Sequence, residues 1–239
     1  MSELATPIKA STIVVVRPDP NGGIEVLMTR RRPEMQFLGG FLVFPGGGVE
    51  NEDCSEKMLS LCRGLTRSDA QKILGTDLGP EMSLGHWVAA VRELFEETGI
   101  HFFIDERGSA PDVSQADVAA RLSEKRRALS NGTFSLSRLL ESESLFCDLA
   151  RLTYLFHRIT PEKYSVRFDT RFYLAALPDN QIPLISSEEV SESLWLTPQN
   201  ALDEAASGKF AMMPPTLITL RTLAEHGSWQ NLSAAFRLG

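Results

Sequence analysis

The sequence of 239 residues has few cysteines, no long apolar run and no basic leader. Its three cysteines, Cys54, Cys62 and Cys147, are odd in number and lack CxxC spacing, which argues against a disulfide framework or a zinc site and predicts reduced thiols. No stretch is apolar for long enough to span a bilayer. The first residues do not resemble a signal peptide, and the final FRLG is not a peroxisomal signal. We therefore expect a cytoplasmic protein without a membrane partner.

Basic residues are in deficit, with 24 Lys and Arg against 31 Asp and Glu and a formal net charge of −7. General binders of nucleic acids or anionic membranes normally carry a basic excess, so this balance argues against both classes. A small anionic substrate remains compatible with the charge, because a metal ion or a local basic patch can reverse the field in one cleft.

The length and the hydrophobic content of 43% suit one domain over residues 1–239, or one domain with an appendage. Two β-branched runs, 11–18 and 24–32, flank DPNGG and predict a hairpin. Further strands are predicted over 40–47, 100–103, 153–161, 167–177 and 190–198, and helices over 66–74, 85–98, 111–132, part of 135–152, 198–208 and 214–227. Because these elements do not alternate as βαβ units, we expect a mixed sheet between helices and not a doubly wound parallel sheet.

The segment RELFEETGI, residues 92–100, places three glutamates on one helix face. Glu93, Glu96 and Glu97 stand at i, i+3 and i+4, where like charges cost about 0.2–0.5 kcal/mol per pair. One explanation is a solvated surface that water and Arg92 screen. The other is a hard divalent cation, since Mg²⁺ and Mn²⁺ take oxygen ligands and keep open positions for phosphate. Gly99 is placed to end the helix just beyond the carboxylates.

These residues resemble the signature of the Nudix hydrolases, in which a glycine, five residues and a glutamate precede R-E-U-x-E-E-x-G-U, with U apolar. Residues 92–100 match every fixed position of the second half, and Gly47 supplies the first glycine. Asp53 stands in place of the glutamate. Between Asp53 and Arg92 lie 38 residues instead of seven, so 31 additional residues interrupt the motif before the helix. The resemblance implies an α/β/α sandwich with a mixed sheet, an insert over 54–84 and a helical insertion over about 113–152.

The resemblance also implies metal-assisted hydrolysis of a nucleoside diphosphate joined to another group. It assigns Mg²⁺ or Mn²⁺ to Glu93, Glu96 and Glu97, and gives Arg92 the role of orienting a glutamate through an ion pair. One of the three glutamates, or one from a distant loop, would be the general base. The loop candidates are Glu188, Glu189 and Glu192. The backbone of Gly46 and Gly47 would line the metal or the phosphate.

Residues 27–47 resemble the motif of coenzyme A diphosphatases within this superfamily, although Gln36 replaces its second arginine. The interrupted motif, together with residues 157–178 and 213–220, resembles the subgroup that contains the peroxisomal coenzyme A diphosphatase. Arg31 stands in a cluster of three arginines, and guanidinium groups match phosphate oxygens bidentately. The alternative for this cluster is an edge strand protected by charge.

The sequence thus predicts a Mg²⁺- or Mn²⁺-dependent pyrophosphohydrolase of coenzyme A or acyl-coenzyme A. The first alternative is a Nudix enzyme acting on ADP-ribose, NADH or a similar compound. A non-catalytic nucleotide-binding module is a further alternative, which the retention of all three glutamates disfavours. The two insertions could cap the site or form a homodimer contact, and the sequence does not choose between these roles.

Overall fold

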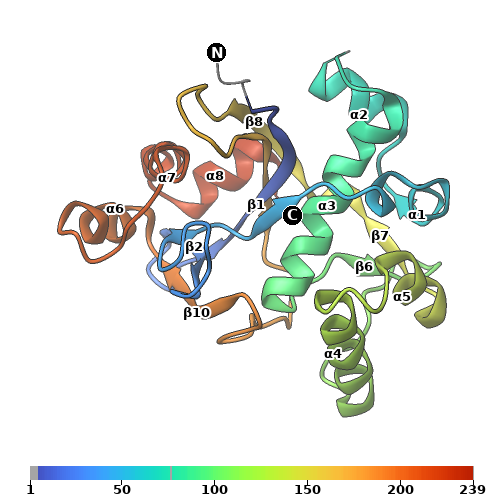
Figure 1. Ribbon diagram of the computed structural model, residues 1–239. Coiled ribbons are helices and arrows are strands. Elements are labelled where there is room, and N and C mark those ends of the chain that lie inside the picture. The colour runs from blue at the N-terminus through green and yellow to red at the C-terminus, as the bar shows by residue number, and fades with distance from the viewer. Residues whose placement is uncertain (1–4, 76, 239) are drawn as a thin grey trace.

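The computed structural model describes residues 5–75 and 77–238. Its strands are β1 (Ile8–Pro18), β2 (Ile24–Arg31), β3 (Leu42–Val43), β4 (Gly46–Gly48), β5 (Cys62–Arg63), β6 (Phe103–Ile104), β7 (Phe146–Asp148), β8 (Thr153–Ile159), β9 (Phe168–Ala176) and β10 (Val190–Leu196). Its α-helices are α1 (Glu56–Ser60), α2 (Arg67–Leu74), α3 (Pro80–Thr98), α4 (Ala116–Ser130), α5 (Leu136–Glu143), α6 (Pro198–Ala206), α7 (Pro214–His226) and α8 (Trp229–Phe236). Two 3₁₀ turns, η1 (Glu52–Cys54) and η2 (Leu149–Arg151), complete the described chain. Figure 1 shows their arrangement.

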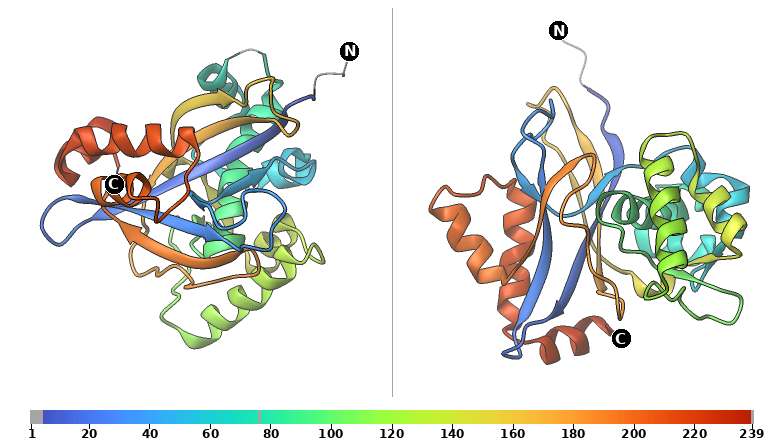
Figure 2. Two further views of the ribbon diagram at one scale, coloured as in Figure 1. Left: turned by 60° about the vertical axis from the view of Figure 1, so that its left-hand side comes forward. Right: turned by 90° about the horizontal axis from the view of Figure 1, so that it is seen from below.

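The main sheet is mixed and lies between two layers of helices. Its order is β10-β2-β1-β9-β8, with β3 paired to β2 and β4 paired to β1. Strands β1 and β9 are parallel, whereas β1 and β2 form the antiparallel hairpin that the sequence predicted. Helices α6, α7 and α8 cover one face of the sheet, and α3 with the helical insertions covers the other (Figure 2). The predicted α/β/α sandwich is therefore confirmed.

Strand β1 is buried on both faces, which explains its continuous apolar run. Because side chains alternate along a strand, Ile13 and Val15 join the core beneath α3, whereas Val14 and Val16 join the core beneath α7. Helix α3 is consequently held against the centre of the sheet. Its last two turns, which carry the glutamates, lie beside the glycine strand β4.

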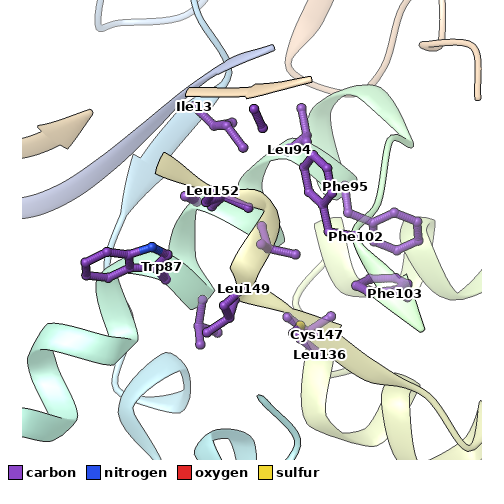
Figure 3. Packing of buried hydrophobic residues seen from close by; sticks show 14 of the residues in the cluster. Ile13, Trp87, Leu94, Phe95, Phe102, Phe103, Leu136, Cys147, Leu149 and Leu152 are labelled. Carbon is purple, nitrogen blue, oxygen red and sulfur yellow. The ribbon is translucent and has the colours of Figure 1, made fainter. Parts of the chain in front are cut away.

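The two insertions pack against each other and against α3. Strand β5 of the first insertion pairs in parallel with β7 of the second, at Cys62 and Cys147, and β7 also pairs with β6. Lys57 forms a 2.7 Å ion pair with Glu141 across the two segments. Their apolar side chains share one core with Trp87 of α3, part of which is drawn in Figure 3. The insertions therefore extend the core on one side of the sheet.

The prediction that part of 135–152 is helical is confirmed by α5 over 136–143; beyond it Ser144 takes a left-handed conformation (φ 55°), buried Cys147 lies in β7, and the 3₁₀ turn η2 follows. Several predicted boundaries were wrong. Helix α3 begins at Pro80 and not at Gly85, since a proline at the first turn starts it. The predicted strand over 100–103 is limited to β6, Phe103–Ile104, because the Gln181 side chain takes up the backbone groups of His101. Helices α1 and α8 were not predicted.

None of the helices in residues 5–75 and 77–238 combines the length and the hydropathy that a membrane crossing requires.

Buried His86 makes the stability of the fold dependent on pH. It lies on α3 facing β1, where its Nδ1 is 3.0 Å from the Ser11 hydroxyl. Burial, with help from the charge of Arg171, lowers the pKa of His86 to about 3. The unfolded chain binds a proton near pH 6.5 and the native chain does not, so stability is lost as the pH falls below 6.5.

We expect His86→Asn to weaken this acid dependence. The lowered pKa contributes a slope of up to about 1.4 kcal/mol of unfolding free energy per pH unit below pH 6.5. Urea denaturation at pH 7, 6 and 5 measures it. Comparing the slopes of variant and wild type isolates His86, because other buried groups also titrate. Equal slopes would show that His86 is protonated in the native state.

Candidate active site

The last two turns of α3 carry four charged side chains that are largely withdrawn from water. The exposed fractions of the Glu93 and Glu96 side chains are 14% and 19%, and Glu97 is 5% exposed. Gly99 ends the helix in a left-handed conformation (φ 76°), as predicted. A solvated acidic surface does not describe this arrangement, so the first explanation for the glutamate triplet is not supported.

Arg92 is the centre of the hydrogen-bond network in this site. Its Nε and Nη2 donate to the two carboxylate oxygens of Asp53, at 2.9 Å each. Nη2 also donates to the Gly48 carbonyl at 2.7 Å. Nη1 donates to Glu93 Oε1 at 2.9 Å and to Glu96 Oε1 at 3.3 Å. Arg92 therefore joins the two halves of the interrupted motif and orients two of the glutamates.

Asp53 is a site residue whose role the sequence left open. It is buried at the η1 turn, and its Oδ2 also accepts a 2.8 Å hydrogen bond from the Glu50 amide. The 54–84 insert leaves the site after Asp53 and returns to α3 without separating Asp53 from Arg92. The shorter carboxylate thus occupies the place of the motif's glutamate and forms a bidentate pair.

Removing this carboxylate should destabilise the protein strongly. Asp53→Ala leaves the buried guanidinium of Arg92 without its main partner, and the expected loss is about 3–5 kcal/mol of unfolding free energy. Urea denaturation in EDTA measures the loss. Asn51→Ala, at an exposed neighbouring position, is the control and should change stability by less than about 0.5 kcal/mol. Equal effects of the two substitutions would contradict a structural role for the Asp53–Arg92 pair.

The glycines of β4 bring the backbone into contact with the glutamates. A Cβ at Gly47 would lie 2.4 Å from Glu93 Oε1, and a Cβ at Gly46 would lie 2.4 Å from the Ser11 carbonyl. Only glycine fits at either position without displacing a neighbour. The backbone of Gly46 opposes the rise in the pKa of Glu97. Gly47 therefore lies directly against the Glu93 carboxylate, and Gly46 against strand β1.

Burial shapes the electrostatics of the glutamates. It raises the pKa of Glu93 to about 7, against the opposing effect of Arg92. It also raises the pKa of Glu96, and it raises the pKa of Glu97 well above its usual range, where neighbouring Glu93 adds to the effect. Glu97 Oε2 is buried and has no hydrogen-bond partner among the described residues. A cation would offset this accumulated negative charge.

The donor set fits a hard divalent ion. Carboxylate oxygens are the ligands that Mg²⁺ and Mn²⁺ prefer, and the unpartnered Glu97 oxygen is a ready acceptor. In the described parts of the chain, no three His, Cys, Asp or Glu side chains already converge as a metal centre. Arg92 holds one oxygen each of Glu93 and Glu96.

A distant loop completes the cleft. The cleft is lined by Glu93, Glu96, Glu97, Ser130, Ser187, Glu188 and Glu189, and the last three belong to the loop before β10. Two of the three glutamates suggested as general bases are thus present. Glu192 instead borders a separate hollow that includes Arg30 and Phe210. The sequence pattern did not indicate which of these three glutamates would face the cleft.

Arg31 is the arginine of its cluster that faces the glutamates. Its Nη2 lies 3.8 Å from Glu189 Oε2, and its charge lowers the pKa of Glu97. All three arginines also bond to backbone carbonyls, Arg30 to Gly40, Arg31 to Phe37 at 3.2 Å, and Arg32 to Ser187. A positive group therefore stands at the edge of the acidic cleft, where a phosphate could contact it.

Comparisons with known proteins agree on one family. The model of the NUDT19 Nudix domain matches residues 67–223. A Caenorhabditis elegans protein named nudix hydrolase 7 is 29% identical over 85% of this chain and 57% of its own length. The human acyl-coenzyme A diphosphatase NUDT19 is 26% identical over 90% of this chain and 64% of its own length. This chain therefore spans about three fifths of these curated relatives. The crystal structure of a NUDIX hydrolase from Alicyclobacillus acidocaldarius has a TM-score of 0.79 and 28% identity, and it covers 98% of this chain and 97% of its own.

Proposed function

Since the chain belongs to the NUDT19 Nudix domain family and is a Nudix hydrolase, we propose that it cleaves the diphosphate of coenzyme A or an acyl-coenzyme A. The observation that carries this proposal is the grouping of three withdrawn carboxylates beside a glycine strand and Arg31. The substrate is inferred from the names of NUDT19 relatives in human and chicken and from the motif over residues 27–47.

We also propose that residues 1–239 form one Nudix domain, because the insertions share its core.

In this proposal, Glu93, Glu96 and Glu97 hold Mg²⁺ or Mn²⁺. When bound, the ion would polarise phosphate oxygens and lower the pKa of a water molecule. Arg92 positions Glu93 and Glu96 and does not touch the substrate. Arg31 binds a phosphate oxygen, and the backbone of Gly46 and Gly47 lines the diphosphate.

Glu189 is the better placed loop glutamate to accept a proton from the attacking water. Glu188 is already paired with Arg126 at 3.1 Å. The Glu189 side chain is 58% exposed, and its contact with Arg31 is a looser 3.8 Å. A proton acceptor needs a carboxylate that can approach the water within hydrogen-bond distance, and Glu189 has that freedom.

The test is product analysis by mass spectrometry. Water adds to one phosphorus and the bridging P–O bond breaks, so coenzyme A should yield an adenosine bisphosphate and a phosphopantetheine. In H₂¹⁸O, one product phosphate gains one ¹⁸O atom. EDTA should abolish the reaction, and added Mg²⁺ or Mn²⁺ should restore it. If coenzyme A stays intact while ADP-ribose or NADH is cleaved, the substrate assignment is wrong and the alternative holds.

A further inference from the structure

A second cavity lies next to the carboxylate cleft, and the proposed function does not use it. Its volume is about 240 Å³. The cavity is bounded by the C-terminal end of α3, by helix α4 of the second insertion, and by the loop before β10. Its apolar lining residues are Phe95, Val113, Ala119, Leu122, Ile182 and Leu184.

The walls of this cavity are fixed to α3. The Gln181 side chain accepts a hydrogen bond from the His101 amide and donates one to the His101 carbonyl, each at 2.9 Å. The Leu184 amide donates to the Thr98 carbonyl at 2.8 Å. The loop that forms one wall is therefore bonded to the chain at the end of the helix that carries the glutamates.

An ion pair separates the cavity from the cleft. Arg126 of α4 lines the cavity, whereas its partner Glu188 lines the cleft. The Arg126 guanidinium donates to Glu188 at 3.1 Å and to the Glu96 carbonyl at 2.6 Å. The charge of Arg126 is thereby paired with that of Glu188, although its buried Nε has no hydrogen-bond partner among the described residues. The cleft is lined mostly by carboxylates, whereas the cavity is lined mostly by apolar side chains.

Two further features of the cavity favour an apolar ligand. Both ring nitrogens of buried His101 lack a hydrogen-bond partner among the described residues, and burial lowers the pKa of His101 to about 4, so its ring is neutral. His101 therefore adds no charge to the lining of the cavity. At the loop, Ile182 is 88% exposed and the nearby Ile185 is 81% exposed, so the apolar surface continues outward from the cavity.

We propose that this cavity binds the aliphatic chain of an acyl-thioester substrate. The inference rests on the proposed function and adds a subsite to it. A flexible arm joins the diphosphate to the thioester, so the chain can reach a cavity beside the cleft. The second insertion, through α4, would then determine selectivity for the acyl chain.

The first experiment compares chain-length preference in two variants of α4. Wild type should hydrolyse octanoyl-coenzyme A with a kcat/KM at least about tenfold above that for coenzyme A, since each buried methylene contributes about a factor of four. Ala119→Phe fills the cavity and should bring this ratio close to one. Ala120→Phe, at the adjacent exposed position, should keep the wild-type ratio. An unchanged ratio in Ala119→Phe, or no chain preference in wild type, overturns the subsite.

The second experiment separates this inference from the proposed function. Octanoyl-pantetheine has no diphosphate, so its binding can be measured by calorimetry in EDTA. It should bind wild type and Ala120→Phe, and bind Ala119→Phe at least about tenfold more weakly. Such binding without cleavage of any coenzyme A would support the cavity and reject the diphosphatase assignment. Absence of binding to wild type would reject the cavity, whether or not coenzyme A is cleaved.

Discussion

Glu97→Gln is expected to lower kcat by about 10²- to 10³-fold and, in metal-free buffer, to make the protein more stable. The first effect follows from the loss of a negatively charged ligand for the divalent ion. The second follows from burial, because Glu97 has a pKa well above its usual range and one oxygen without a hydrogen-bond partner among the described residues. Glutamine has nearly the same shape and no charge, so it removes the unfavourable charge without leaving a cavity.

The sign of the stability change can be checked against pH. A carboxyl group with a raised native pKa binds its proton more tightly in the folded chain than in the unfolded chain. In metal-free wild type, Glu97 should therefore contribute a loss of stability as the pH rises above the ordinary glutamate pKa of about 4.3, opposite in sign to the contribution of His86 below pH 6.5. Glu97→Gln should lose less over the same range. Urea denaturation in EDTA at pH 5, 6, 7 and 8 measures both proteins.

The matched control for this substitution is Glu81→Gln, at the exposed first turn of the same helix, where Glu81 lies 3.6 Å from Arg67. It should change neither turnover nor the response of stability to Mn²⁺. Mn²⁺ should stabilise wild type and the control, and stabilise Glu97→Gln much less. Wild-type turnover in Glu97→Gln would remove this residue from the metal site.

The central part of the site was predictable because its information is local. Glu93, Glu96 and Glu97 share a face through the period of one helix, and Gly99 ends that helix at the place its sequence indicates. The β1–β2 hairpin is similarly local, because its turn residues and flanking strands are adjacent in the chain. Each of these predictions needed only a few neighbouring residues.

The outer part of the site depends on contacts between distant segments. Arg126 lies 30 residues from Glu96 and 62 residues from Glu188, and it bonds to both. Neither helical period nor strand alternation encodes which face of α4 will meet the loop before β10. The same limit applies to β7, whose three residues become a strand only because β5 and β6 lie on either side. Short elements of this kind take their conformation from tertiary contacts.

Gly47→Ala is expected to lower kcat/KM about 100-fold, since misplacing a reacting group by about 1 Å can cost this much. The added Cβ would meet the Glu93 carboxylate, with Oε1 at 2.4 Å and Cδ at 2.5 Å. No side chain tolerates that approach, so Glu93 must move away from Gly47. Its 2.9 Å hydrogen bond to Arg92 would weaken at the same time. Steady-state kinetics with a saturating divalent ion measures the loss.

The adjacent glycine supplies a control that distinguishes a steric clash of the added Cβ from an effect on backbone flexibility. A Cβ at Gly48 would meet only the Lys9 carbonyl, at 4.0 Å. Both glycines belong to β4 and pair with β1, so alanine should reduce the flexibility of the unfolded chain similarly at the two positions. Gly48→Ala should therefore keep activity within about twofold of wild type, because ordinary van der Waals contact displaces nothing. Equal losses in the two variants would mean that β4 acts through backbone conformation, and that Gly47 does not hold space for Glu93.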